Sequence, residues 1–240
     1  MGSGFRRDDG VWEHTKHMPE HDPIIVWDLP TRLFHWTLVV LILLQYLSGE
    51  FGLLPMEWHY WLGYATLALV VFRVLWGFAG SRTSRFAAFV RGPATVARYA
   101  IDSLHGRAAH VVGHNPLGGW SVLLMLASVL VQSVSGLFAS DDLVESGPFA
   151  ASVSDATMQL MTRVHNVNRY VLLLLIVLHI CAVLLHWAMR HENLVAPMLH
   201  GRGPGDGSEP MRIASVGRAI VLLVVSAIVV ALVVIWGGYA

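Results

Sequence analysis

The chain has 240 residues, of which 55% are hydrophobic and only 13% are charged, and its mean hydropathy is +0.57. This balance excludes an ordinary soluble domain and is typical of a membrane protein. The 16 lysines and arginines balance the 16 aspartates and glutamates, so no excess positive charge indicates a nucleic-acid partner, and the single cysteine, Cys181, excludes an internal disulfide.

Five apolar segments approach the roughly 20 residues that a membrane-spanning helix needs. In chain order they cover residues 31–49, 58–80, 120–140, 168–187 and 216–236. The sequence therefore predicts an all-α membrane protein. We expect a polar cytoplasmic tail at 1–30, a four-helix transmembrane bundle at 31–190, a cytoplasmic loop at 191–215 and a fifth transmembrane helix at 216–240. We find no sequence repeat and no low-complexity tract.

The distribution of lysine and arginine predicts the orientation of these helices, because cytoplasmic loops carry an excess of both. The tail and the second and fourth loops contain most of the basic residues: Arg6, Arg7, Lys16 and Arg32, then Arg82, Arg85, Arg91, Arg98 and Arg107, then Arg190, Arg202 and Arg212. The loop at 50–57 has none, and the loop at 141–163 has only Arg163. We expect the N-terminus in the cytoplasm and the C-terminus in the periplasm.

Three histidines lie in and just before the fourth segment, in "RVHNVNRYVLLLLIVLHICAVLLHW". An imidazole in hydrocarbon needs a partner, because an unsatisfied polar group there is costly. His165 and His179 are 14 residues apart, which is about 40° short of four full helical turns and about 21 Å along the axis. They share a helix face but cannot share one metal ion. His186, at the expected inner surface, is more simply a polar anchor.

Two other helices each supply one further histidine at a matching depth. His35, in "TRLFHW", lies near the inner end of the first helix, and His59, in "EWHYWLGY", near the outer end of the second. Depth then pairs His59 with His165 and His35 with His179. A cofactor that takes two axial imidazoles and fits inside a helical bundle is haem b. The sequence therefore predicts two haem b sites, held non-covalently because the chain lacks Cys-x-x-Cys-His.

An arginine accompanies the predicted inner site. Arg73 follows His59 by 14 residues, so it lies on the same helix face at the depth of the inner haem. A lone arginine in a spanning helix needs an anion, and a haem propionate would serve; a snorkelling interfacial residue is the alternative. Three more arginines near the ligands complete the predicted cofactor-binding set: Arg32, Arg163 and Arg169.

Several short motifs resemble a known family. "TRLFHW", "HYWLGY", the His-x13-His of the fourth helix and "ENLVAPMLHG" resemble the bacterial cytochrome b561 family, and "VGHNPLGGW" at 112–120 resembles the second loop of the b-type cytochrome subunit of nickel–iron hydrogenases. The resemblance covers about 26–201. It implies a four-helix bundle with two haems, electron transfer between quinone and a partner protein, and the ligands His35, His59, His165 and His179. The fifth helix departs from the four-helix members.

The sequence thus predicts a di-haem cytochrome of the respiratory chain that relays electrons across the inner membrane between the quinone pool and a periplasmic redox protein such as a cytochrome c. Protons for the quinone would come from inner-surface groups such as His186 or Glu192. The alternatives are a superoxide:quinone oxidoreductase, a hydrogenase-like cytochrome subunit, and a histidine-lined metal or proton transporter. Self-association into a homo-oligomer stays open. Acidic residues dominate the expected outer face: Glu50, Glu57, Asp141, Asp142, Glu145 and Asp155.

Overall fold

The computed structural model describes residues 24–108, 111–140, 146–190, 192–203 and 212–238. Within these ranges, five helices are long and apolar enough to cross a membrane: α1 (Leu29–Gly49), α2 (Met56–Ala79), α5 (Pro116–Gly136), α6 (Asp155–Arg190) and α8 (Val216–Gly237). The predicted class, an all-α protein with several membrane spans, is confirmed. Some residues used in the orientation and partner predictions lie outside the described ranges: Arg6, Arg7, Lys16, Asp141, Asp142 and Glu145. Residues 109–110, shortly after Arg107, also lie outside them.

Side chains cap the first turns of three long helices. Asp28 accepts a hydrogen bond from the backbone N–H of Thr31 at 2.8 Å, and Asn115 accepts one from the N–H of Gly118 at 2.8 Å. Ser215 caps α8 in the same way. Such caps satisfy N–H groups that have no partner within the helix, so each of these helices begins at a defined residue near one end of the bundle.

Helix α6 is much longer than the hydropathy pattern indicates. It begins at Asp155 rather than near 168 and continues to Arg190, 36 residues in all, or about 54 Å at the usual rise. Its first three turns mix polar and apolar residues, so their mean hydropathy is too low to indicate a membrane span, but they contain neither glycine nor proline. His165 consequently lies inside a continuous helix instead of at its start.

Helix α5 ends at Gly136, four residues before the expected boundary at 140. The following chain folds back over the helix end: the N–H of Gly147 donates to the carbonyl of Ala139 at 2.8 Å, and the N–H of Phe149 to that of Leu137 at 2.9 Å. A Cβ on Gly147 would lie only 2.4 Å from the Leu137 carbonyl oxygen, so this return requires glycine. Tertiary packing, not apolarity, ends the helix.

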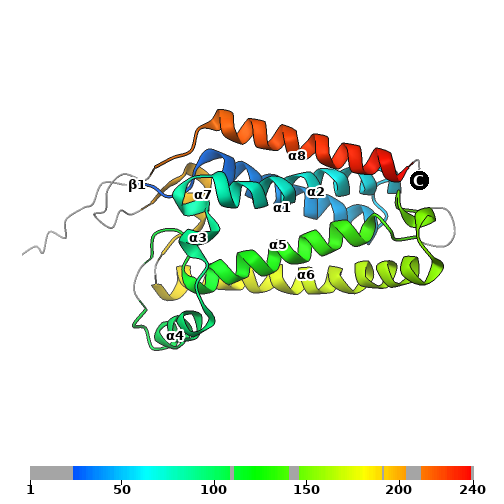
Figure 1. Ribbon diagram of the computed structural model, residues 1–240. Helices are drawn as coiled ribbons and strands as arrows, with labels where there is room; N and C mark the ends of the chain where they lie inside the picture. Colours follow the sequence, from blue (N-terminus) through cyan, green and yellow to red (C-terminus); the bar gives the residue numbers. More distant parts are fainter. Residues whose placement is uncertain (1–23, 109–110, 141–145, 191, 204–211, 239–240) are drawn as a thin grey trace, which may run out of the picture.

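Helix α2 is central, and it packs against α1, α5 and α8, while α6 packs against α5. Figure 1 shows α8 on the side of α1 and α2 that faces away from α5 and α6. Buried side chains from four of these helices form one cluster: Phe34, Phe72, Trp76, Leu126 and Ala219. The fifth long helix therefore covers α2 from outside the group formed by α1, α2, α5 and α6.

A small clasp closes the end of the bundle at which α1 begins, here called the α7 end. Strand β1 (Ile24–Ile25) pairs antiparallel with β2 (Arg202–Gly203), which follows helix α7 (Val195–His200). The N–H groups of Val26 and Trp27 donate to the Gly201 carbonyl. Gly201 has φ +86°, and a Cβ there would lie 2.9 Å from the Trp27 carbonyl oxygen, so this close approach requires glycine.

The loops expected at 81–119 and 191–215 contain short structure of their own. The first holds the 3₁₀ helix η1 (Arg82–Ser84) and helices α3 (Phe86–Phe89) and α4 (Pro93–Leu104); the second holds α7 and β2. Figure 1 shows α4 almost end-on, so its axis crosses the direction of the long helices. Asn193 starts α7 by accepting from the N–H groups of Val195 and Ala196, both at 3.0 Å, a local signal that hydropathy does not register.

A buried carboxylate ties these segments to the long helices. Asp28, only 3% exposed, accepts from the indole Nε1 of Trp76 in α2 at 3.2 Å and from the Ser84 hydroxyl of η1 at 3.3 Å. Because buried carboxylates are stable only when hydrogen-bonded, this network holds the start of α1, the end of α2 and the following loop in one arrangement.

Candidate cofactor site

Four histidines form two pairs inside the bundle. His35 of α1 faces His179 of α6 with ring centroids 6.5 Å apart, and His59 of α2 faces His165 of α6 at 6.3 Å. Two imidazoles that bind one metal ion from opposite sides have centroids roughly 6 to 6.5 Å apart, because each ligating nitrogen lies about 2 Å from the metal. Both pairs have this spacing, and they are the pairs that depth predicts.

The two pairs are separate sites. His165 and His179 are 14 residues apart on α6, which corresponds to about 21 Å along the axis. Among the described residues, no three histidine, cysteine, aspartate or glutamate side chains converge as metal ligands do. Each pair could therefore give an ion two protein ligands, and a flat macrocycle such as haem would supply the remaining ones.

Hydrogen bonds orient the rings of the His59–His165 pair. The Nδ1 atom of His59 lies 3.0 Å from the Ser48 hydroxyl of α1. The Nδ1 atom of His165 lies 2.9 Å from the Gln132 carbonyl of α5 and 3.3 Å from the Ser135 hydroxyl. When Nδ1 is engaged in this way, Nε2 is the atom left for a metal.

The His35–His179 pair lacks a corresponding hydrogen bond at His35. The Nδ1 atom of His35 is buried and has no hydrogen-bond partner. The neighbouring Trp36 ring meets the His35 ring edge-on, with centroids 4.9 Å apart. The two histidine pairs therefore share their spacing but differ in what holds the imidazoles.

Arg73 is the most unusual charged residue of the bundle. It is 2% exposed, so its side chain does not reach the surface as a snorkelling arginine does. Its guanidinium lies over the Phe86 ring at 5.4 Å and near the Phe34 ring at 6.0 Å, and its Nη1 atom has no hydrogen-bond partner. A buried, unsatisfied guanidinium is costly, and an anionic group on a bound cofactor would remove that cost.

The other three arginines of the predicted set have different surroundings. Arg32 donates from Nη1 to the Leu199 carbonyl of α7 at 2.6 Å. Arg169 pairs with Glu50 at 2.5 Å. Arg163 is exposed and lies two residues before His165, on nearly the opposite side of the helix. Arg32 and Arg169 thus contact protein groups in the structure. Contact of Arg32, Arg163 or Arg169 with a haem propionate stays a prediction.

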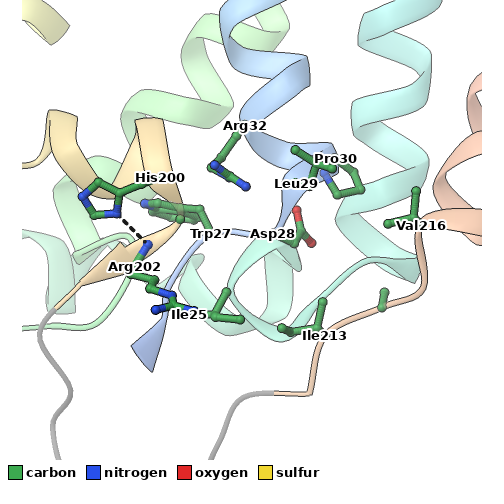
Figure 2. Close-up of a pocket in the computed structure, with 12 residues that line it drawn as sticks. Ile25, Trp27, Asp28, Leu29, Pro30, Arg32, His200, Arg202, Ile213 and Val216 are labelled. Carbon is green, nitrogen blue, oxygen red and sulfur yellow. Dashed lines mark hydrogen bonds between the residues drawn. The ribbon is translucent and has the colours of Figure 1, made fainter. Parts of the chain in front are cut away.

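A pocket of about 330 Å³ opens at the α7 end between the clasp and the start of α8. Figure 2 shows its lining, which includes Trp27, Asp28 and Arg32, with the N–H of Arg202 donating to Nδ1 of His200 at 3.2 Å. None of the four paired histidines lines it. This pocket is therefore distinct from the two sites between the histidine rings.

Sequence reasoning missed a fifth histidine near the His35–His179 pair. His114 precedes α5, and its ring lies between Trp27 at 4.6 Å and Phe89 at 4.8 Å. Part of the residue is exposed, but its Nδ1 atom is buried without a partner. Burial, with Arg73 nearby, lowers the pKa of His114 to about 3. His114 lies in "VGHNPLGGW", in a loop, so the helical spacing that relates His165 to His179 could not place it near the four paired histidines.

Comparison with known proteins identifies the family. The family model described as prokaryotic cytochrome b561 matches residues 26–201. The chain belongs to the prokaryotic cytochrome b561 family. It is also similar to a probable Ni/Fe-hydrogenase B-type cytochrome subunit from Rhizobium leguminosarum bv. viciae, with 22% identity over 222 residues that cover 78% of this chain and 92% of that protein. The resemblance found in the sequence is confirmed.

A prokaryotic cytochrome b561 is a b-type cytochrome of the membrane, and the family implies haem b. The residues present fit that group. Both histidine pairs have the spacing of two axial imidazoles, and Arg73 offers a buried guanidinium to a propionate. The matched residues 26–201 contain both pairs, while the two strands of the clasp lie just outside the match and α8 follows it. A histidine-lined transporter, the alternative from a different class, does not account for this match.

Proposed function

We propose that each histidine pair holds one b haem through its two imidazoles, and that this cytochrome relays electrons across the bacterial inner membrane between a periplasmic redox protein and the quinone pool. The observation that carries the proposal is the spacing of the two ring pairs, 6.5 Å and 6.3 Å, at two depths of one bundle. Bound haem supplies reversible one-electron chemistry.

The protein's own residues determine what that chemistry is used for. The two imidazoles of each pair would hold the haem between them, so each site would use its histidines for binding and would leave none for a substrate. Arg73 provides the counter-charge for a propionate at the His35–His179 site. The hydrogen-bonded Nδ1 atoms of His59 and His165 hold their rings in place. These features support electron transfer rather than reaction at a metal-bound ligand.

The basic residues support the proposed orientation, with the α7 end in the cytoplasm. Arg82, Arg85, Arg91 and Arg98 all lie in the segment between α2 and α5 at that end. Quinone reduction also needs protons. His186 is half-buried near the end of α6, with its Nδ1 atom 3.1 Å from the Ala182 carbonyl, and Glu192 follows. We propose that these two residues supply protons to quinone at the cytoplasmic end.

The test is haem quantitation on the purified full-length protein. We expect a b-type visible spectrum, about two haems per chain, and complete removal of the haem by acid–acetone extraction. One haem per chain, or a colourless protein, would contradict the proposal. Electron exchange with quinone is then tested by adding quinol to native membranes and measuring haem reduction. Membranes that contain this protein are compared with membranes that lack it.

A hydrogenase-like complex is the second candidate, and the similarity to the Rhizobium subunit over most of its length favours it. In that case the redox partner is a hydrogenase-type protein. The distinguishing measurement is haem reduction by hydrogen gas in native membranes. Reduction that disappears when the gene for this chain is deleted supports this candidate; no hydrogen-dependent reduction supports the relay to another partner.

A further inference from the structure

Two copies of a five-residue motif, Gln-x-x-Ser-Gly, lie in this chain. They are "QYLSG" at 45–49 and "QSVSG" at 132–136. Helix α1 ends at the glycine of the first copy, and α5 ends at the glycine of the second. Each copy contacts one histidine of the same pair.

The first contact favours one tautomer of His59. The Ser48 hydroxyl donates its single hydrogen to the Gln45 carbonyl at 3.0 Å and lies 3.0 Å from Nδ1 of His59. Because that hydrogen is already used, the hydroxyl accepts, and the imidazole donates from Nδ1–H. The tautomer that results carries its lone pair on Nε2, the atom available to a metal.

The second copy makes the same arrangement around His165. The Ser135 hydroxyl donates to the Val131 carbonyl at 2.6 Å and lies 3.3 Å from Nδ1 of His165. The Gln132 carbonyl lies 2.9 Å from the same Nδ1 atom, and a carbonyl can only accept. Nδ1 of His165 therefore carries the proton, and Nε2 is again free.

The glycines allow this close approach. A Cβ at Gly49 would lie 2.8 Å from Cε1 of His59, and a Cβ at Gly136 would lie 2.9 Å from Cε1 of His165. Both distances are shorter than two carbon atoms tolerate without a shift. Neither glycine has a positive φ, so the requirement for glycine comes from the imidazole ring and not from the backbone.

The other pair lacks this support at His35. The Nδ1 atom of His35 is buried and has no hydrogen-bond partner. An imidazole that donates a hydrogen bond from Nδ1 is a more basic ligand, and a more basic ligand stabilises the oxidised metal. The two sites therefore differ in a property that affects the reduction potential of whatever metal they hold.

We propose that the two Gln-x-x-Ser-Gly motifs are positioning elements that fix the tautomer and ring orientation of His59 and His165, and that they give the haem at this pair the lower reduction potential of the two. This inference rests on the proposed function, in which each pair ligates one haem. Electron transfer from the His59–His165 site to the His35–His179 site is then energetically downhill, towards the α7 end.

The test is an optical redox titration of the full-length protein in detergent. We expect two waves, and the wave lost in His59→Ala should be the one at lower potential. Ser48→Ala and Ser135→Ala should each shift that wave to higher potential and leave the other wave unchanged. The electron paramagnetic resonance signal of the same oxidised haem should change in Ser48→Ala, and it should change less in Ser135→Ala, because Nδ1 of His165 keeps the Gln132 carbonyl at 2.9 Å.

Two serines serve as matched controls, because each is buried and hydrogen-bonded without touching a histidine. Ser128, two turns before Ser135 on α5, donates to the Asn168 side chain at 3.1 Å, and Ser226 of α8 donates to the Leu222 carbonyl at 2.8 Å. Their alanine variants should leave both waves in place. Ser135→Thr keeps the hydroxyl and should keep the wild-type potential.

Gly49→Ala and Gly136→Ala provide an independent measurement that does not depend on potentials. Each should lower the haem content towards one per chain, with the higher-potential wave remaining. Unshifted waves in both serine variants, a shift of the other wave, or a lower-potential wave assigned to His35–His179 would each overturn the inference while two haems per chain are retained. A wild-type protein without two haems overturns the proposed function itself.

Discussion

The guanidinium of Arg169 lies 2.5 Å from the carboxylate of Glu50, joining α6 to the residue that follows α1. Arg169 also donates to the hydroxyl of Tyr170 at 2.8 Å. Glu50 is therefore neutralised by a protein side chain, so it adds less negative charge to that end of the bundle than the sequence indicates. Glu57 and Asp155 are exposed at the same end, and among the described residues the negative character of that surface depends on these two.

The acidic residues at this end of the bundle indicate which charge a periplasmic partner should carry. A basic redox protein such as a cytochrome c is attracted by negative charge, whereas superoxide, an anion, is repelled. We expect the electron-transfer rate to fall steeply as salt concentration rises, and Asp141→Asn combined with Asp142→Asn to flatten that dependence. Stopped-flow measurement over a salt series gives the answer. Haem reduction by superoxide near the diffusion limit and indifferent to both changes would instead favour the superoxide:quinone oxidoreductase.

Replacing single ligands should separate the two sites. His59→Ala and His165→Ala should each remove the same haem and give matching spectra, because their rings face each other at 6.3 Å. His35→Ala and His179→Ala should match each other in the same way. Haem content and redox titration of the four variants provide the comparison. A His35→Ala variant that matches His165→Ala would show that the pairing is wrong.

Replacing Arg73 with leucine should have opposite effects on the haem-free and haem-bound protein. Without haem, the change removes a buried guanidinium with an unpartnered Nη1 atom and should raise the thermal stability. With haem, it removes the counter-charge of a propionate and should lower the potential or the occupancy of the His35–His179 haem. The His59–His165 haem serves as the internal control, and unchanged titration of both haems would argue against the propionate contact.

His114 predicts a loss of stability in acid. Its pKa is about 3 in the folded protein against 6.5 in a free chain, so below about pH 6.5 the unfolded chain binds a proton that the folded protein does not. Stability should therefore fall as the pH decreases, by at most about 2 kcal/mol between pH 6.5 and 5. The test is the unfolding temperature of the wild type and of His114→Phe, measured over this pH range. The unfolding temperature of the variant should depend less on pH, and an equal pH dependence in both proteins would exclude His114 as the cause.

The parts of the fold that depend on apolar segment length and on residue spacing along the chain were predictable from the sequence. Apolar length indicated five helices, and the spacing of His165 and His179 indicated two depths on one face. The parts that depend on contacts between residues distant in sequence were not predictable. The clasp forms because Gly201 lets the chain reach Trp27, and α6 extends to Asp155 through polar turns. His114 reaches the His35–His179 pair through a loop, and the serines that contact His59 and His165 come from two different helices.

Helix α6 carries one histidine of each pair on a single unbroken stretch from Asp155 to Arg190. With one haem at each pair, as proposed above, this helix would set the distance between the two centres. The two ligand positions are about 21 Å apart along its axis, and no loop movement or partner encounter at either end alters that separation. Because electron tunnelling slows steeply with distance, the step between the two centres should run at one characteristic rate, and binding of a partner should change only how often an electron arrives.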